Sequence, residues 1–116
     1  MNKKYIIRKN EEIQKVIAKE NKIVNKYFII FYVKNLLGYN KYCVSVSKKI
    51  GKANVRNLYK RRIKDILMKN NFNNSSDYVI ILRKEILNIS YEKMCEVLNK
   101  VLRGDNKWKG RLQLYY

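Results

Sequence analysis

The segment at residues 53–69 restricts the fold of this chain more than any other, because its two faces have opposite chemistry. A helix advances by about 100° per residue, so the apolar side chains of this segment fall in one arc and its basic side chains in another. An amphipathic helix buries its apolar face against a neighbouring element. We therefore expect a long helix that packs on a sheet and presents its cations outward. The apolar positions are Val55, Tyr59, Ile63, Ile66 and Leu67, and the outward positions are Arg56, Asn57, Lys60, Arg61 and Lys64.

An earlier, shorter helix is expected to begin at Asn10, a good N-cap residue followed by two glutamates that suit the positive end of a helix dipole. Ile13, Val16 and Ile17 have the i, i+3, i+4 spacing of one helix face. This pattern predicts a helix that ends near residues 20–22.

Three segments have the composition of strands. Residues 27–33 are aromatic and β-branched throughout, residues 42–47 alternate strictly in polarity, and residues 77–82 form a third apolar run. We expect the first two strands to pair as a hairpin with a loop of several residues. A basic loop at residues 48–52 then leads into the long helix.

The last helix has a clear start at Ser90, a good N-cap, and Gly104 ends it. Residues 105–116 show no periodicity and are expected to be a loosely ordered tail of one domain that spans residues 1–116. The element order is helix, strand, strand, helix, strand, helix. It predicts an α+β sandwich, in which a small mixed sheet of three to four strands is packed against helices.

The charge balance points to a polyanionic partner. Lys and Arg number 27 and Asp and Glu number 9 in 116 residues, so the formal charge is 27 − 9 = +18. Charge of one sign repels itself and destabilises a compact domain, so a partner of opposite sign is the simplest explanation. Nucleic acid is the first candidate and an anionic membrane surface is the second. Apolar residues make up 47% of the chain, which is enough for a folded core.

Several classes of chemistry are excluded. The chain has no His, so it has neither a Ser–His or Cys–His nucleophile nor a His-ligated zinc site. Cys43 and Cys95 are far apart, and reduced thiols are favoured over a single disulfide. The longest apolar stretch is far shorter than the ~20 residues of a membrane span, and the basic N-terminus lacks the apolar region of a signal peptide. We expect a cytoplasmic protein.

A phosphate backbone would find several kinds of donor at the start of the long helix. Lys48, Lys49 and Lys52 precede it, beside the free N–H groups and the positive dipole end of its N-terminus, and Gly51 permits a sharp turn. Loop and helix together offer point charges, forked guanidinium groups and amide donors. A Lys/Arg face is often only a solvated surface, but the net charge favours RNA or DNA binding here.

The same region resembles the signature of the bacterial ribonuclease P protein family. Residues 45–64 read SVSKKIGKANVRNLYKRRIK, which is similar to the family's strand ending in SVSKK, its G-x-A and its R-N-x-x-K-R run on a helix. The similarity extends over about residues 8–103. The chain departs from the family at Ile13 and Ile17, where the family tends to have Phe, and at Leu58, where a basic residue is common.

This resemblance implies a sheet with the rare left-handed β-α-β crossover, similar to the second domain of ribosomal protein S5, although crossovers are right-handed as a rule. It implies an accessory subunit of an endoribonuclease, with catalysis carried by a partner RNA that needs Mg²⁺. No protein catalytic residue and no metal or cofactor bound by the protein alone are expected. The implied partners are the catalytic RNA and precursor tRNA, with no membrane and one monomeric protein per RNA.

The resemblance also implies two sets of site residues. RNA contacts are expected from Lys48, Lys49, Lys52, Arg56, Asn57, Lys60, Arg61 and Lys64. A cleft for the single-stranded 5′ leader of precursor tRNA is expected at Ile13, Ile17 and Phe31, with Arg83 and Lys84 as cations at its rim. Plain core packing is the competing interpretation of the three apolar residues.

Other interpretations remain open from the sequence. Packing in the core or the hairpin is expected for Tyr27, Tyr32, Tyr39 and Tyr42, while Trp108, Tyr115 and Tyr116 belong to the tail. A ribosomal or other structural RNA-binding protein is the main alternative. A double-stranded-RNA-binding domain is disfavoured because its Gly-Pro-x-His element is missing. A magnesium-dependent nuclease that acts alone is disfavoured because the acidic residues are scattered.

Overall fold

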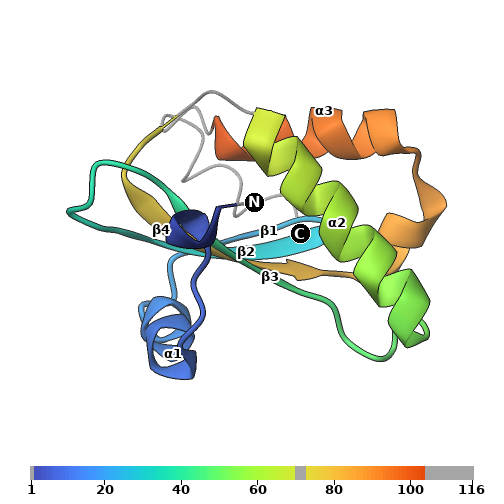
Figure 1. Ribbon diagram of the computed structural model, residues 1–116. Coiled ribbons are helices and arrows are strands. Elements are labelled where there is room, and N and C mark those ends of the chain that lie inside the picture. The colour runs from blue at the N-terminus through green and yellow to red at the C-terminus, as the bar shows by residue number, and fades with distance from the viewer. Residues whose placement is uncertain (1, 70–72, 104–116) are drawn as a thin grey trace.

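The computed structural model describes residues 2–69 and 73–103, and within them it contains a four-stranded sheet with helices on both faces (Figure 1). Helices α2 and α3 cover one face, and α1 lies against the other. The helices are α1 (Asn10–Ala18), α2 (Ala53–Lys69) and α3 (Tyr91–Leu102), with short 3-10 turns η1 (Lys3–Tyr5) and η2 (Lys84–Asn88). The strands are β1 (Lys22–Val24), β2 (Phe28–Lys34), β3 (Lys41–Ser45) and β4 (Ser76–Leu82). The predicted α+β sandwich is confirmed.

The predicted hairpin between β2 and β3 is wrong. The strand order is β1-β2-β4-β3, so β4 lies between the two strands and pairs antiparallel with β2 and parallel with β3. The physical reason is burial: Tyr78, Val79 and Ile80 of β4 are all buried, so this strand is covered on both faces and takes a central position. The strands that follow each other in the chain are therefore separated in the sheet.

The β3–α2–β4 unit brings two parallel strands together, as the sequence predicts. Helix α2 has the predicted bounds, and its predicted apolar stripe faces the sheet: Tyr59, Ile63, Ile66 and Leu67 are buried, while Val55 is half-buried against the same core. The left-handedness of this crossover stays a prediction of the family resemblance.

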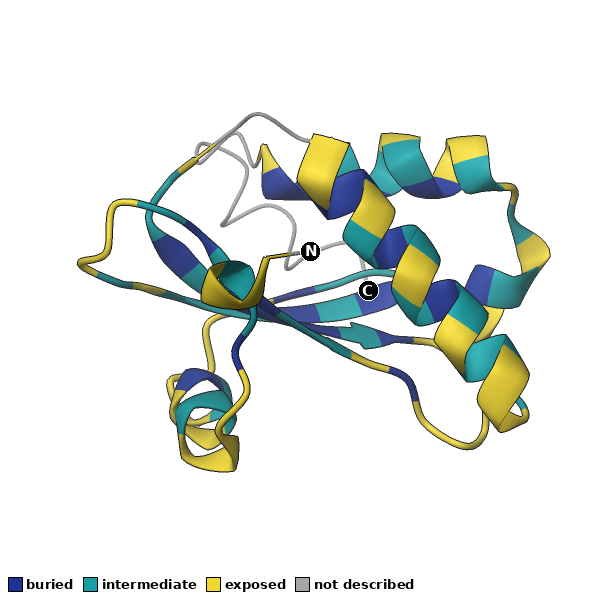
Figure 2. Cartoon of the chain, viewed as in Figure 1, coloured by how far each residue is buried: buried dark blue, intermediate teal, exposed yellow. Residues whose placement is uncertain are grey.

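The two faces of the sheet are covered differently: α2 and α3 each carry four buried residues, whereas α1 carries one, Val16, and is mostly exposed or half-buried (Figure 2). Alternate residues of a strand point to opposite faces. Phe28 and Ile30 of β2 therefore enter the main core, where they meet Ile80, Met94 and Leu98 between the sheet, α2 and α3. The cluster under α1 is much smaller. Its buried members are Ile7, Val16 and Val79, and around them pack the half-buried Ile13, Ile17, Phe31, Val33, Cys43 and Ile81.

The helix termini differ in how well they follow the sequence. Lys9 rather than Asn10 occupies the N-cap of α1, without a side-chain hydrogen bond, so Asn10 is already the first helical residue. Ser90 is the N-cap of α3 as predicted, and its Oγ accepts a hydrogen bond from the Lys93 N–H at 3.1 Å. Strand β1, which follows α1 and pairs with β2, is an element that the sequence pattern did not indicate. Gly104 and the predicted tail at residues 105–116 lie outside the described residues.

Two further expectations concern the cysteines and the membrane. Cys43 and Cys95 are free thiols, as favoured from the sequence. Among the helices within the described part of the chain, none combines the length and the apolar character needed to cross a membrane.

Candidate nucleic-acid interface

The structure gathers the predicted RNA contacts on one continuous stretch, here called the basic surface. Its loop is anchored by the buried Ile50, whose N–H donates to the Ser47 carbonyl at 3.1 Å, and α2 continues directly from it. Five members are exposed and three are half-buried. The exposed members are Lys48, Lys49, Lys52, Asn57 and Arg61, and the half-buried members are Arg56, Lys60 and Lys64.

Gly51 positions this loop through a close approach and not through an unusual backbone angle. Its φ lies outside the left-handed region, and within the described residues Gly38 is the glycine with a positive φ, at +82°. A Cβ added to Gly51 would lie 3.1 Å from both Cβ and Cγ1 of Val55. The expected sharp turn is therefore a matter of space: the missing side chain lets the loop pass against the first turn of α2.

The cations of the basic surface are free of ion pairs within residues 2–69 and 73–103. The salt bridges there join Lys41 to Glu12, Lys69 to Asp65 and Lys93 to Glu96. Asp65 stands four residues after Arg61, but its carboxylate contacts the Lys69 ammonium at 3.1 Å and accepts a hydrogen bond from the Tyr91 hydroxyl. The hydrogen bond from Tyr91 and, to a smaller extent, the contact with Lys69 hold the pKa of the Asp65 carboxyl below its usual value. The positive charge of the basic surface is therefore available to a ligand.

Arg56 carries a buried polar atom that lacks a partner. Its Nε is enclosed by the protein and makes no hydrogen bond among the described residues. Leaving a buried donor unsatisfied costs about 1–3 kcal/mol. An anion that drew the guanidinium into a bidentate contact would relieve this cost, so Arg56 is poised to gain from a phosphate ligand.

The basic surface adjoins the α1 face of the sheet at Cys43 of β3. Burial raises the pKa of the Cys43 thiol, and the positive charges of Lys60 and Lys64 partly offset that rise. Helix α2, which carries both lysines, packs against β3, the edge strand that contains Cys43. Strand β3 therefore connects α2 with the apolar cluster under α1, to which Cys43 belongs.

The predicted leader residues lie on that α1 face. Ile13 and Ile17 of α1 and Phe31 of β2 all pack, half-buried, in the small cluster under α1. Lys22 of β1 is in register with Phe31, and its Nζ lies 5.9 Å from the ring centre. A half-buried aromatic ring beside a cation is suited to stack a base and hold the adjoining phosphate. Lys22 was not among the predicted site residues, because the sequence pattern did not indicate β1.

The sheet continues beyond this cluster as a partly open row. Val24, Ile29 and Ile81 are paired in register across β1, β2 and β4 and are half-buried, while Ser45 of β3 ends the row and is exposed. In-register neighbours share one face of a sheet. The α1 face therefore offers an apolar floor that the protein does not fully cover.

The two predicted rim cations differ in their freedom. Arg83 and Lys84, directly after β4, are both exposed. The Arg83 guanidinium donates to the Asn25 carbonyl at 2.9 Å, so it is tied to the turn between β1 and β2. Both residues follow β4 directly, and the parallel register of β3 and β4, in which Ser45 pairs with Ile81, puts this end of β4 on the same side of the sheet as the end of β3. No group of three or more His, Cys, Asp or Glu side chains in the described ranges could hold a metal ion.

These features define a class of protein: a small, strongly basic α+β domain whose exposed helix face and apolar sheet face are suited to RNA. The sequence model of the Ribonuclease P family matches residues 1–104. The ribonuclease P protein component of Mycoplasma mycoides is 41% identical over 107 residues, covering 89% of this chain and 97% of that protein.

Solved structures agree with the sequence comparison. The ribonuclease P protein of Staphylococcus aureus superposes with a TM-score of 0.76 at 27% identity, covering 85% of this chain and 93% of that one. The protein from Thermotoga maritima also gives 0.76, at 26% identity and with coverage of 83% and 93%. The chain belongs to the ribonuclease P protein family. This membership confirms the family resemblance and does not favour a ribosomal role.

Proposed function

We propose that this chain, as the protein subunit of ribonuclease P, binds the catalytic RNA and the 5′ leader of precursor tRNA and so aids removal of the leader. The observation that carries the proposal is the basic surface, which joins seven cations and Asn57 on one loop and one helix without an ion pair inside the described ranges. A protein component of ribonuclease P is part of an endoribonuclease complex, so RNA is the expected ligand of the basic surface.

Each part of the basic surface suits a different element of an RNA backbone. Arg56 and Arg61 have planar guanidinium groups that clamp a phosphate through two hydrogen bonds. The lysines neutralise phosphates as point charges, and binding releases the counterions that surrounded the RNA. Asn57 is exposed beside them and offers its amide to a ribose or a phosphate. We assign this surface to the catalytic RNA.

We assign the α1 face to the leader. Phe31 presents a half-buried ring next to Lys22, and Ile13 and Ile17 border it from α1. A base stacked on Phe31 would be bound without being identified, because every base has an aromatic face. Arg83 and Lys84 would bind phosphates of the RNA leader where it passes the end of β4. The short path from this face to Lys60 and Lys64 would let one protein contact both RNAs.

The proposal leaves the chemical step to the RNA. Family resemblance assigns the magnesium ions and phosphodiester hydrolysis to the catalytic RNA, and the His-free sequence with its scattered acids offers no obvious general base. The protein's contribution is then electrostatic and positional. We further propose one monomeric protein for each RNA, acting in the cytoplasm.

Reconstitution tests this proposal. The purified chain is assayed on precursor tRNA alone, with a bacterial ribonuclease P RNA, and with that RNA but without the chain. We expect cleavage at the mature 5′ end only where the RNA is present, and more of it where both are present. Cleavage by the chain alone would favour the nuclease alternative, and specific recovery of ribosomal RNA from cells would favour the ribosomal one.

A further inference from the structure

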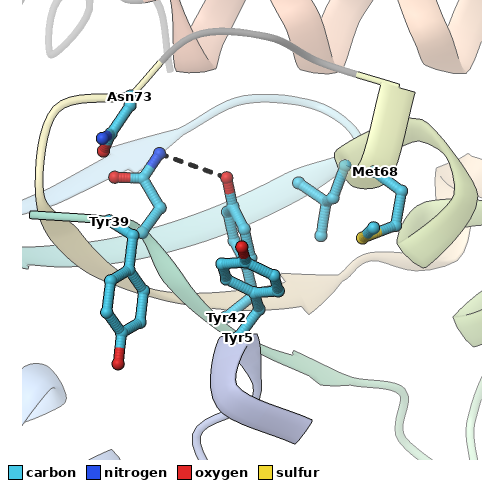
Figure 3. Close-up of a pocket in the computed structure, with 7 residues that line it drawn as sticks. Tyr5, Tyr39, Tyr42, Met68 and Asn73 are labelled. Atoms are coloured by element: carbon cyan, nitrogen blue, oxygen red, sulfur yellow. Dashed lines mark hydrogen bonds between the residues drawn. The ribbon is translucent and has the colours of Figure 1, made fainter. Parts of the chain in front are cut away.

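Beyond the basic surface and the α1 face, residues within the described ranges form two adjoining hollows at the end of the sheet near the N-terminus. The first, here called the tyrosine pocket, has a volume of about 250 Å³ (Figure 3). It lies between η1, the β2–β3 connection, the start of β3 and the C-terminal end of α2. Its walls are Tyr5, Tyr39, Asn40, Tyr42, Leu67, Met68 and Asn73.

The second hollow, here called the cationic hollow, has a volume of about 390 Å³ and shares Tyr39 with the tyrosine pocket. Five cations line it against a single carboxylate, that of Glu12, which pairs with Lys41 at 3.7 Å. The cations are Lys3, Lys4, Arg8, Lys9 and Lys41. None of the five belongs to the basic surface of α2.

Lys4 and the two outer tyrosines join the hollows into one site. The rings of Tyr5 and Tyr39 meet edge to face, with centroids 5.6 Å apart. The Lys4 Nζ lies 4.7 Å from the centre of the Tyr39 ring and 5.3 Å from that of Tyr5. A cation is therefore held directly beside the aromatic walls, within the roughly 6 Å of a cation–π contact, so a phosphate partner and a stacking surface lie side by side.

The polar groups of the tyrosine pocket are neutral and include both donors and acceptors. The Tyr42 hydroxyl accepts from Asn40 Nδ2 at 3.2 Å, and within the described part of the chain nothing accepts its own proton. The Asn73 amide donates to the Gly38 carbonyl and accepts from the Ser75 N–H, which leaves one N–H and one lone pair for a ligand. A neutral heteroaromatic ring with mixed donors and acceptors matches such a lining. The volume is slightly below the roughly 300–1,000 Å³ of ligand pockets in general, so it suits one ring system.

We infer that the two hollows bind one unpaired nucleotide of an RNA strand, with its base in the tyrosine pocket and its phosphate in the cationic hollow. The inference rests on the proposed function for the nature of the polyanion, and it adds a third RNA contact on a separate part of the molecule. The excess of cations over carboxylates in the cationic hollow favours a strand with successive phosphates over a free nucleotide.

Photocrosslinking locates the base directly. The purified full-length chain is irradiated with a six-nucleotide oligouridylate that contains 4-thiouridine, and the linked residues are mapped by mass spectrometry. We expect adducts at Tyr5, Tyr39 or Tyr42. Adducts confined to α1, β2 or residues 53–64 of α2 would overturn the inference.

Variants of Tyr39 and Lys4 test the tyrosine pocket and the cationic hollow separately. For each variant, the adduct yield at Tyr42 is measured as a function of the oligonucleotide concentration. Tyr39→Leu should weaken apparent binding there about 5- to 150-fold, which corresponds to the loss of one stacked base, whereas Tyr39→Phe should change it less than two-fold. Lys4→Ala should weaken it more than Lys26→Ala, a matched exposed lysine elsewhere. Leu36→Ala, a fully exposed residue of the same connection, controls for changes in the loop.

Thermal denaturation of each variant separates loss of binding from loss of folding, and only variants that melt like the parent are compared. Equal yields for Tyr39→Leu and Tyr39→Phe would contradict a stacked base. Competition by uridine monophosphate at the same concentration as the oligonucleotide would contradict a strand. If the parent chain supports precursor-tRNA cleavage and yet forms no pocket adducts, the inference fails while the proposed function stands.

Discussion

The Lys22 Nζ lies 5.9 Å from the centre of the Phe31 ring, on neighbouring strands whose residues are paired in register. This pair stands on the sheet face that α1 covers only in part. A cation next to a half-buried ring gives the α1 face both elements needed to hold a single strand: a stacking platform and a phosphate partner.

The first prediction is therefore that Phe31→Ala weakens binding of precursor tRNA to the reconstituted complex by about 1–3 kcal/mol, the range for one stacked base. Mature tRNA lacks the leader, so its affinity should change much less. Phe31→Tyr retains the ring and should bind like the parent. Equal losses for the two tRNAs would make Phe31 a packing residue and remove the leader assignment.

The second prediction concerns the basic surface. Replacing Arg56, Lys60 and Arg61 by Ala should weaken binding to the catalytic RNA and make the log–log salt dependence shallower by roughly 0.7 to 0.9 for each lost phosphate contact. The domain should stay folded, because none of the three is part of the buried core.

A control with the same loss of net charge replaces three exposed lysines elsewhere, Lys19, Lys26 and Lys100, by Ala. Filter binding over a series of salt concentrations compares the two triple variants. If both had the same affinity and salt slope, the overall charge and not the arrangement on α2 would govern binding.

The third prediction concerns Gly51. Adding a methyl group there places it 3.1 Å from two carbons of Val55, so Gly51→Ala should destabilise the domain by about 1–3 kcal/mol, as overpacking does. In a chain that already carries Val55→Ala, the same Gly51→Ala change should cost less free energy of unfolding, because the shorter side chain at position 55 leaves more room. Urea denaturation measures the three free energies of unfolding, and strictly additive losses would show that the two residues do not touch.

The fourth prediction is a loss of stability at high pH. Burial raises the pKa of Tyr78 from 10.0 to about 12, although its hydrogen bond with Asn74 acts in the opposite direction. A pKa raised by folding adds stability that is complete below the unfolded value and disappears as the pH rises through the folded value. The contribution, up to about 3 kcal/mol, should therefore vanish between about pH 10 and pH 12.

Denaturation at a series of pH values measures this effect for the parent chain and for Tyr78→Phe, which has no ionisable hydroxyl. The two proteins differ only in this hydroxyl, so the difference between the two curves isolates Tyr78. Parallel curves from pH 9 to 12 would contradict the assignment.

Local patterns in the sequence predicted those parts of the fold that depend on one segment at a time. The stripe of Tyr59, Ile63 and Ile66 defined α2, and Ser90 marked the start of α3 because its side chain caps the helix. The pairing of β4 between β2 and β3 could not be predicted in this way. It depends on contacts between distant segments, and a hairpin satisfies the same local pattern.

The candidate site shows the same division. The loop and the helix face carry their cations at recognisable spacing, so the basic surface was predictable from residues 45–64. Lys22 was missed because three residues of β1 are too few to show a period, and Lys4 was missed because its role depends on Tyr39, more than thirty residues away. The partial cover over Phe31 likewise follows only from where α1 packs.

We propose that this protein offsets the electrostatic repulsion between the catalytic RNA and precursor tRNA, and cleavage at low magnesium is the decisive measurement. Single-turnover rates of precursor-tRNA cleavage by ribonuclease P RNA are measured over a magnesium series, with the parent chain, with the Arg56, Lys60 and Arg61 triple Ala variant, and with no protein. A domain of charge +18 between two polyanions should replace part of the screening by Mg²⁺. We expect the parent chain to shift half-maximal cleavage to lower magnesium and the triple variant to do so less. An unchanged magnesium dependence with the parent chain would contradict the proposal.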